Sequence, residues 1–331
     1  MVADNPRAMT PPRFIVPGRL HFLTIRTVCR MFKLVPQREV VRVFEYLFAV
    51  SAQRFGMQIH EALCMSNHFH ALVTDVEGLL PKFVEYLDML LARSLNAMRG
   101  ESGSVFEKGY GQIEVTSDEK ALEHAVYILA NPCEADLVRR SRHWPGFSTL
   151  KMKYGESVVF ERPKVGLWRR AAERAERKRK RTRNAKREAY RGKPSTMPER
   201  IEFRLERPPV HDELSDIELR AQVLAGLDAR ELMFIVARGE RGADVLGVKK
   251  VLAQPWYGFP GRKEDMFGTE PGVSGRRKWA RIEALQRRKE FREAYAAARA
   301  KFVAGIRDVV WPYGTWLMRV RLALPCGTAP P

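Results

Sequence analysis

The order of hydrophobic and polar positions predicts strands and helices in alternation over the first half of the chain. Four apolar runs have the length and flanking turn residues of strands: residues 20–27, 58–65, 69–74 and 112–115. Three segments repeat apolar side chains every three or four positions, as amphipathic helices do: residues 37–55, 79–98 and 117–131. Ser117 offers an N-cap for the third helix, and Pro132 is expected to end it.

This order of elements is strand, helix, strand, strand, helix, strand, followed by a helix. It predicts an α+β domain of the ferredoxin-like (split βαβ) type, in which an antiparallel sheet carries helices on one face. The other face of such a sheet stays open for a ligand. We expect the domain to span residues 13–155, after a Pro-rich, disordered lead-in at residues 1–12.

The pattern changes after residue 155. Residues 156–200 are rich in Lys and Arg with almost no apolar stripe, which predicts a basic linker or a solvated helix. Residues 201–331 are mainly helical by pattern, with short helices between Ser215 and Ala253 and a long basic helix from Ser274 to Phe302. The short helices suggest an accessory DNA-binding module of the helix-turn-helix kind, although short helices around glycines are common in other settings.

Charge narrows the class of partner. The 331 residues carry a formal net charge of +19, and the sequence pI is about 10.1. Such a field favours a polyanion, and we expect nucleic acid rather than a membrane surface. A basic surface without a specific partner is the alternative.

The four cysteines indicate the compartment. They lack C-x-x-C spacing, so neither a zinc ribbon nor a disulfide framework is predicted, and reduced thiols are expected. The chain begins without a secretory pattern and has no uncharged apolar run of about 18 residues. We therefore expect a cytoplasmic, nucleoid-associated protein without a membrane partner.

Two histidines in the predicted third strand carry the first candidate chemistry. Side chains alternate along a strand, so His68 and His70 point to the same face while Phe69 points to the core. Two imidazoles on one face make half of a metal site. The alternative is a pair of strand histidines with local hydrogen bonds.

The helix after Ser117 offers the other half. Tyr127 and Asn131 are four residues apart and share one helix face with His124, a candidate proton acceptor. If this helix crosses the open face, Asn131 would give an amide oxygen to a divalent cation. The Tyr127 hydroxyl, a poor nucleophile at neutral pH, would attack a phosphate polarised by that cation. Taken singly, a half-buried core tyrosine and a helix stop are the ordinary interpretations of Tyr127 and Asn131.

Further basic and aromatic residues are candidate DNA contacts, by charge and by base stacking. They are Arg93, Lys108, Tyr110, Arg177, Lys178, Arg179, Lys180 and Arg181. Packing is the alternative for Tyr110, and a solvated charge run is the alternative for residues 177–181.

Four motifs, in this order, resemble those of the REP-associated tyrosine transposases, a branch of the single-tyrosine HUH (histidine–hydrophobic–histidine) transposases. They are Met65–Val73, Val105–Tyr110, Tyr127–Pro132 and Trp144–Ser148. The resemblance covers about residues 13–155 and does not extend to the rest of the chain.

The resemblance implies a palm-type domain that binds folded single-stranded DNA, typically a hairpin of a repeated extragenic palindrome, and nicks it with Mg²⁺ or Mn²⁺. It implies that Tyr127 is the nucleophile, that His68 and His70 bind the metal, and that Asn131 is the third ligand. Two alternatives stay open: a non-catalytic binder of structured nucleic acid, and a nickase that initiates replication or mobilisation. Monomer and homodimer are both compatible with the sequence.

Overall fold

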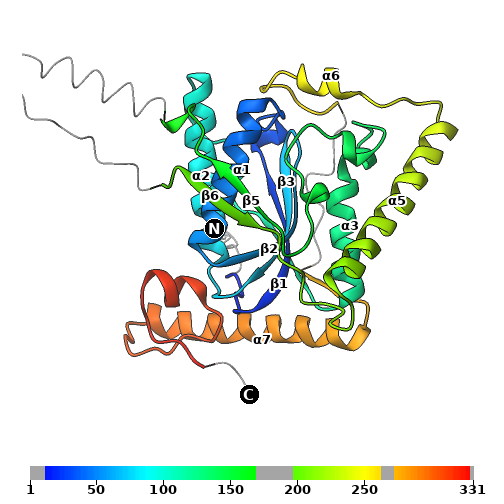
Figure 1. The fold of residues 1–331 in the computed structure, drawn as a ribbon. Helices are drawn as coiled ribbons and strands as arrows, with labels where there is room; N and C mark the ends of the chain where they lie inside the picture. Colours follow the sequence, from blue (N-terminus) through cyan, green and yellow to red (C-terminus); the bar gives the residue numbers. More distant parts are fainter. Residues whose placement is uncertain (1–11, 169–196, 262–271, 329–331) are drawn as a thin grey trace, which may run out of the picture.

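The computed structural model describes residues 12–168, 197–261 and 272–328 and builds them around a five-stranded sheet (Figure 1). The strands are β1 (Arg19–Arg26), β2 (Met57–Cys64), β3 (His68–Asp75), β4 (Gly111–Val115) and β7 (Val273–Ser274). Their order in the sheet is β2-β3-β1-β4-β7. The first four strands pair antiparallel in the order of a ferredoxin-like sheet, and β7 adds in parallel at the edge. The predicted α+β class is confirmed.

Helices lie on both faces of this sheet (Figure 1). The helices α1 (Arg38–Arg54) and α2 (Leu80–Arg99) cover one face, where Phe44 of α1 meets Phe69 of β3 with ring centroids 5.2 Å apart. The helix α3 (Asp118–Glu134) contacts β2 and β3 from the other side. The face that carries His68 and His70 is therefore covered in part by the helix that carries Tyr127.

One predicted boundary is wrong, because α3 continues past Pro132 to Glu134. Proline removes one N–H donor from the backbone hydrogen bonds of the helix, but the amide of Ala135 still donates to the carbonyl of Asn131 at 3.0 Å. The helix therefore ends in the turn after the proline, and Asn131 keeps helical geometry.

Part of the second half of the chain joins the same core, whereas Ala298, Val309 and Trp311 form a small cluster of their own. Strand β5 (Ser157–Glu161), inside the predicted linker, pairs antiparallel with β6 (Arg200–Arg204). Apolar residues of β6 and of the long helix α5 (Asp216–Glu240), such as Phe203 and Val223, are buried in one hydrophobic cluster with the sheet. The sequence-based division at residue 155 therefore does not separate two hydrophobic cores. Residues 169–196 of the predicted linker lie outside the described residues.

The expectation of short helices between Ser215 and Ala253 is corrected in part. The capping box of Ser215 and Glu218 opens α5, which then runs for 25 residues, and only α6 (Val248–Leu252) is short. The structure thus has a long helix packed along α3 in place of a helix-turn-helix pair (Figure 1). The predicted basic helix is α7 (Lys278–Val303), beneath the sheet edge in Figure 1.

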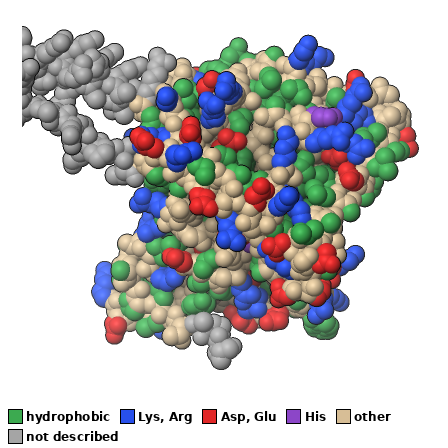
Figure 2. Space-filling model, in the orientation of Figure 1, with side chains coloured by type: hydrophobic (Ala, Val, Ile, Leu, Met, Phe, Trp, Pro, Cys, Tyr) green, Lys and Arg blue, Asp and Glu red, His purple; other side chains and the backbone are tan. Residues whose placement is uncertain are grey.

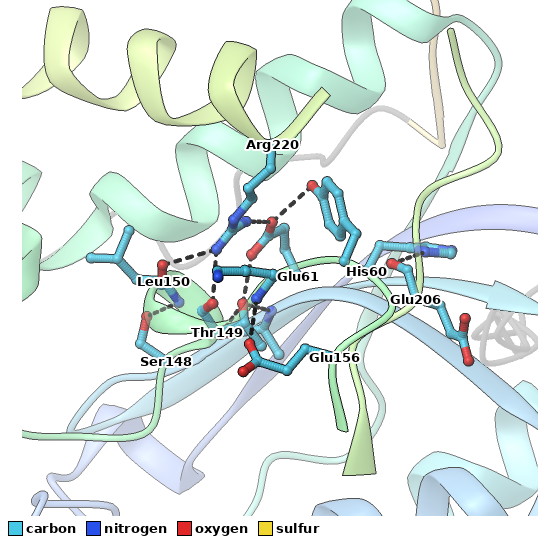
Figure 3. Close-up of polar contacts among 11 residues, drawn as sticks. His60, Glu61, Ser148, Thr149, Leu150, Glu156, Glu206 and Arg220 are labelled. Carbon is cyan, nitrogen blue, oxygen red and sulfur yellow. Dashed lines mark hydrogen bonds and ion pairs between the residues drawn. The ribbon is translucent and has the colours of Figure 1, made fainter. Parts of the chain in front are cut away.

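A buried polar network joins α5 to the sheet (Figure 3). Arg220 points from α5 to the carboxylate of Glu61 on β2 and donates to the carbonyl oxygens of Thr149 and Leu150 at 2.8 and 2.9 Å. Glu61 also accepts from the hydroxyls of Thr149 and Tyr154 at 2.5 and 3.0 Å. Both members of the ion pair are buried, so the network fixes the position of α5 on the domain.

Charged side chains are mixed on the face drawn in Figure 2, where Lys and Arg lie among acidic and apolar groups. The excess positive charge is therefore not gathered into one continuous patch on this face. Among the described helices, none has the length and apolar character that crossing a membrane requires.

Candidate functional site

The histidine pair lies side by side on β3, with ring centroids 4.7 Å apart. The antiparallel register places Thr24 of β1 opposite His70 and Arg26 opposite His68. Because side chains alternate along each strand, these four residues share the face toward α3. The predicted orientation of the two histidines is what the structure has.

The helix α3 brings its candidate residues onto this face. The Ser117 side chain caps its N-terminus by accepting from the amide of Lys120, as the sequence predicts. The Tyr127 ring meets the His70 ring edge to face, with centroids 5.4 Å apart. One turn further on, Asn131 is buried, and its side chain is close enough to His68 to affect the pKa of that imidazole. Tyr127, both histidines and the Asn131 amide therefore converge in one place.

Hydrogen bonds orient both imidazoles. Nδ1 of His70 lies 3.3 Å from the Leu23 carbonyl oxygen, which can only accept, and 3.1 Å from the Thr24 hydroxyl. Nδ1 of His68 lies 2.7 Å from Oδ1 of Asn67. With each Nδ1 donating its proton, each Nε2 keeps the lone pair that a metal ligand needs. Burial lowers the pKa of His68 to about 3 and that of His70 well below its usual value, so both rings are neutral at pH 7.

The donor set of this site fits a divalent cation. Two neutral imidazoles held by oxygen acceptors are ordinary metal ligands, and the Asn131 amide would add an oxygen donor. Within the described residues, no group of three or more His, Cys, Asp or Glu side chains is arranged to hold a metal. The third ligand would thus come from an amide, and imidazole donors suit Mn²⁺ better than Mg²⁺.

A cavity of about 340 Å³ opens beside Tyr127 and His70. Its charged lining residues are Arg26, Lys120, Glu123 and Arg230, three cations and one anion, in addition to two histidines. A surplus of positive charge next to a tyrosine hydroxyl suits a phosphodiester. Sequence reasoning missed these cations, since none lies in a recognisable motif.

Helix α5 supplies Arg230 to this cavity from more than a hundred residues beyond the histidine strand. Its guanidinium carbon lies 5.4 Å from the centroid of the Tyr127 ring. One Nη donates to Glu134 at 3.3 Å, whereas the buried Nε has no hydrogen-bond partner among the described residues. An N–H donor is therefore left over beside the tyrosine.

Two other contacts fix α5 against α3. A methyl group added at Gly226 would lie 2.9 Å from the Val126 side chain, so the two helices approach closely there. Arg238 donates to the Cys133 carbonyl at 3.0 Å and to Asp136 at 2.7 Å, which adds a side-chain donor to a carbonyl at the end of α3 that also accepts from the Asp136 amide. The C-terminal region thereby positions the helix that carries Tyr127.

His124 lines the same cavity. It stacks on Phe22 with centroids 4.5 Å apart, and its Nε2 has no hydrogen-bond partner among the described residues. Burial, aided by the charge of Lys120, lowers its pKa to about 4. A group with this pKa is a weak proton acceptor at neutral pH, so the geometry places His124 at the site without making it an effective base.

None of the predicted DNA contacts within the described residues lines this cavity. Lys108 is exposed in the loop before β4, where the neighbouring Glu107 amide bonds the Arg26 carbonyl at 2.9 Å. Arg93 is exposed on α2, which covers the opposite face of the sheet.

Tyr110 is partly buried beneath Arg13, whose guanidinium carbon lies 3.6 Å from the centroid of the Tyr110 ring. The Tyr110 hydroxyl is buried, which corresponds to the packing alternative. Arg177, Lys178, Arg179, Lys180 and Arg181 lie outside the described residues.

Comparisons with known proteins give weak structural similarities. No protein-family model matches the sequence, and no curated protein matches it. A structure of a REP-associated tyrosine transposase bound to a REP hairpin aligns with a TM-score of 0.36 and 16% identity, over 41% of this chain and 79% of the other. A candidate transposase from Deinococcus radiodurans R1 aligns with a TM-score of 0.27 and 20% identity, over 34% and 91%. These TM-scores are too low to establish a shared family or activity.

Proposed function

We propose that the protein is a transposase-like enzyme that nicks and rejoins single-stranded, hairpin-forming DNA through a phosphotyrosine at Tyr127. The observation that carries the proposal is the convergence of Tyr127 and Asn131 of α3 with His68 and His70 of β3. Repeated extragenic palindromes are the substrate that the motif resemblance favours.

Each group of residues at the site would have its own role in the reaction. Arg230, Arg26 and Lys120 would hold the scissile phosphate in the cavity beside Tyr127. His68, His70 and Asn131 would hold a divalent cation, which supplies charge stabilisation at the phosphoryl oxygens when bound. Oη of Tyr127 attacks phosphorus and loses its proton to solvent. The bond from phosphorus to O3′ breaks, and O3′ takes up a proton to become a free 3′-hydroxyl. The reverse attack by that hydroxyl reseals the strand, because the phosphotyrosine conserves the bond energy.

A direct assay uses hairpin oligonucleotides with single-stranded flanks, labelled at one end, with Mn²⁺ or Mg²⁺ and with EDTA as the control. A 5′-phosphotyrosine retains the downstream fragment, so a 3′ label should move to the protein on a denaturing gel and a 5′ label should not. Hairpin binding without transfer of either label would favour the non-catalytic binder.

Replacing both His68 and His70 by Ala should remove the metal-stimulated part of adduct formation. The double substitution removes two of the three proposed metal ligands, and these ligands would orient the cation at the site. His143→Ala, which removes an exposed histidine that lies outside β3 and does not line the cavity, is the matched control and should keep wild-type activity. Equal metal stimulation in the double variant and the control would refute the assignment of the ligands.

Arg230→Gln should slow adduct formation by about tenfold or more, the usual order for losing a hydrogen bond to a charged group. Arg230→Lys keeps the charge but loses the planar guanidinium, so its rate of adduct formation should lie between those of Arg230→Gln and the wild type. Arg241→Gln removes an exposed arginine from the end of the same helix and should have little effect. Rates for Arg230→Gln that equal those of Arg241→Gln would exclude Arg230 from the phosphate site.

A further inference from the structure

A second cavity lies on the opposite face of the sheet from the histidine site. It has a volume of about 230 Å³, and residues of the N-terminal segment, β4 and α7 line it: Arg13, Phe14, Gln112, Arg288, Phe291 and Arg292. Gln112 adjoins Ile113, which lines the histidine cavity, and neighbouring side chains on a strand point to opposite faces. We call this cavity the three-arginine pocket. Nothing in the proposed chemistry at Tyr127 uses it.

Arg13 is held in the pocket by neutral groups. Its guanidinium donates to Oε1 of Gln112 at 3.3 Å and to the carbonyl oxygen of Tyr110 at 3.0 Å, and it stacks on the Tyr110 ring. These contacts fix the direction of the guanidinium. They do not neutralise its charge.

Arg288, like Arg13, is held by a neutral group that does not neutralise its charge. It donates one Nη to the Gly272 carbonyl at 2.5 Å, while its Nε is buried without a hydrogen-bond partner among the described residues. Burial and the positive charges of Arg292 and Arg13 lower its pKa, whereas Glu114 acts in the other direction.

The carboxylate that acts on Arg288 does not line the pocket. Glu114 is shared by two other arginines, Arg19 at 3.9 Å and Arg287 at 3.6 Å. No acidic residue is among the described residues that line the pocket. Arg13 and Arg288 are partly buried, and Arg292 is exposed at the edge of the cavity. Partly buried guanidinium groups are normally paired, so two of them beside a third cation, with no anion among the described lining residues, leave a charge for a ligand to neutralise.

The size and walls of the cavity define the ligand. A volume of about 230 Å³ is below the roughly 300–1,000 Å³ of pockets that enclose drug-sized molecules, so it suits a phosphate group better than a whole nucleotide. Phe14 and Phe291, with ring centroids 4.8 Å apart, form an apolar wall on which the adjoining sugar and base would pack. We propose that the three-arginine pocket binds one backbone phosphate of a nucleic-acid strand.

The test measures binding alone, by fluorescence anisotropy of a labelled single-stranded oligonucleotide at several salt concentrations. The double variant Arg288→Gln/Arg292→Gln should lower the affinity by about tenfold or more. The negative slope of log affinity against log salt should become shallower by about 0.7, because one phosphate contact is lost. Lys289→Gln removes a charge from the exposed residue next to Arg288 and should weaken binding less than about twofold. A double variant that merely doubles the effect of Lys289→Gln would overturn the proposal.

A second variant disturbs the pocket without removing charge. A methyl group added at Gly272 would collide with the guanidinium of Arg288, so Gly272→Ala should displace that group and weaken oligonucleotide binding with the net charge intact. Circular dichroism checks that each variant is folded. Unchanged oligonucleotide binding by a folded Gly272→Ala and a folded Arg292→Gln would count against a strand phosphate.

A parallel titration with inorganic phosphate distinguishes a backbone phosphate of a nucleic-acid strand from free phosphate as the ligand of the three-arginine pocket. If free phosphate raises the melting temperature of the wild type but not of Arg288→Gln/Arg292→Gln, while oligonucleotide affinity stays equal, the pocket takes free phosphate and the strand proposal fails. The readout is independent of catalysis. Weak binding by the pocket variants would support the proposal even if the wild type formed no adduct at Tyr127.

Discussion

Tyr127→Phe is expected to abolish the covalent protein–DNA adduct while leaving hairpin binding within about twofold of the wild type, the usual range for a substitution that breaks no packing. The substitution removes only the hydroxyl. The ring contacts with His70 and Phe22 and the approach of Arg230 depend on the aromatic ring and stay in place. Without Oη no phosphotyrosine can form.

The measurement compares 3′-label transfer to protein with anisotropy binding of the same oligonucleotide. Tyr257→Phe, an exposed tyrosine after α6, is the matched control and should form adduct at the wild-type rate. If adduct persisted in Tyr127→Phe at the rate of the control, another nucleophile would have to be sought.

Arg220→Met is expected to lower the free energy of unfolding by about 3–5 kcal/mol, because it leaves the Glu61 carboxylate buried without its counter-charge. For a chain of this size, the melting temperature should fall on the order of 10 °C. Adduct formation should fall as well at temperatures near that transition, since Arg220 fixes the helix that carries Arg230 (Figure 3).

Two comparisons test the cause of this loss. Arg200→Met breaks an exposed ion pair with Glu161 and should change stability by less than about 1 kcal/mol. Glu61→Leu/Arg220→Met removes both buried charges and should recover much of the stability. Thermal unfolding followed by circular dichroism measures all four proteins. If Arg220→Met and Arg200→Met melted together, the network would not hold α5.

The sequence predicted the parts of the site that depend on local periodicity. Alternation along β3 places His68 and His70 on one face, and the four-residue spacing of Tyr127 and Asn131 places them on one face of α3. Packing of that helix against the histidine face was a hypothesis that only the three-dimensional structure could establish, and the ring contact of Tyr127 with His70 establishes it.

The remaining parts depend on contacts that periodicity does not encode. Arg230 reaches Tyr127 because α5 packs along α3, and from an earlier turn of the same helix Arg220 reaches Glu61 of β2. Neither contact has a sequence motif, and the glycines inside α5 suggested several short helices where tertiary packing sustains one. The pattern likewise suggested a division after residue 155, whereas apolar residues of β6 and α5 join the first core and only a small cluster around Trp311 is separate from it.

The central claim is that Tyr127 forms the covalent link to DNA, and peptide mapping of the adduct tests it most directly. Wild-type protein is incubated with the hairpin oligonucleotide and Mn²⁺, digested with nuclease and trypsin, and analysed by mass spectrometry. We expect a residual nucleotide attached through its 5′-phosphate to Tyr127, in the tryptic peptide that follows Lys120 and ends at Arg139. A nucleotide attached to any other residue, or no adduct with any hairpin substrate and metal, would contradict it.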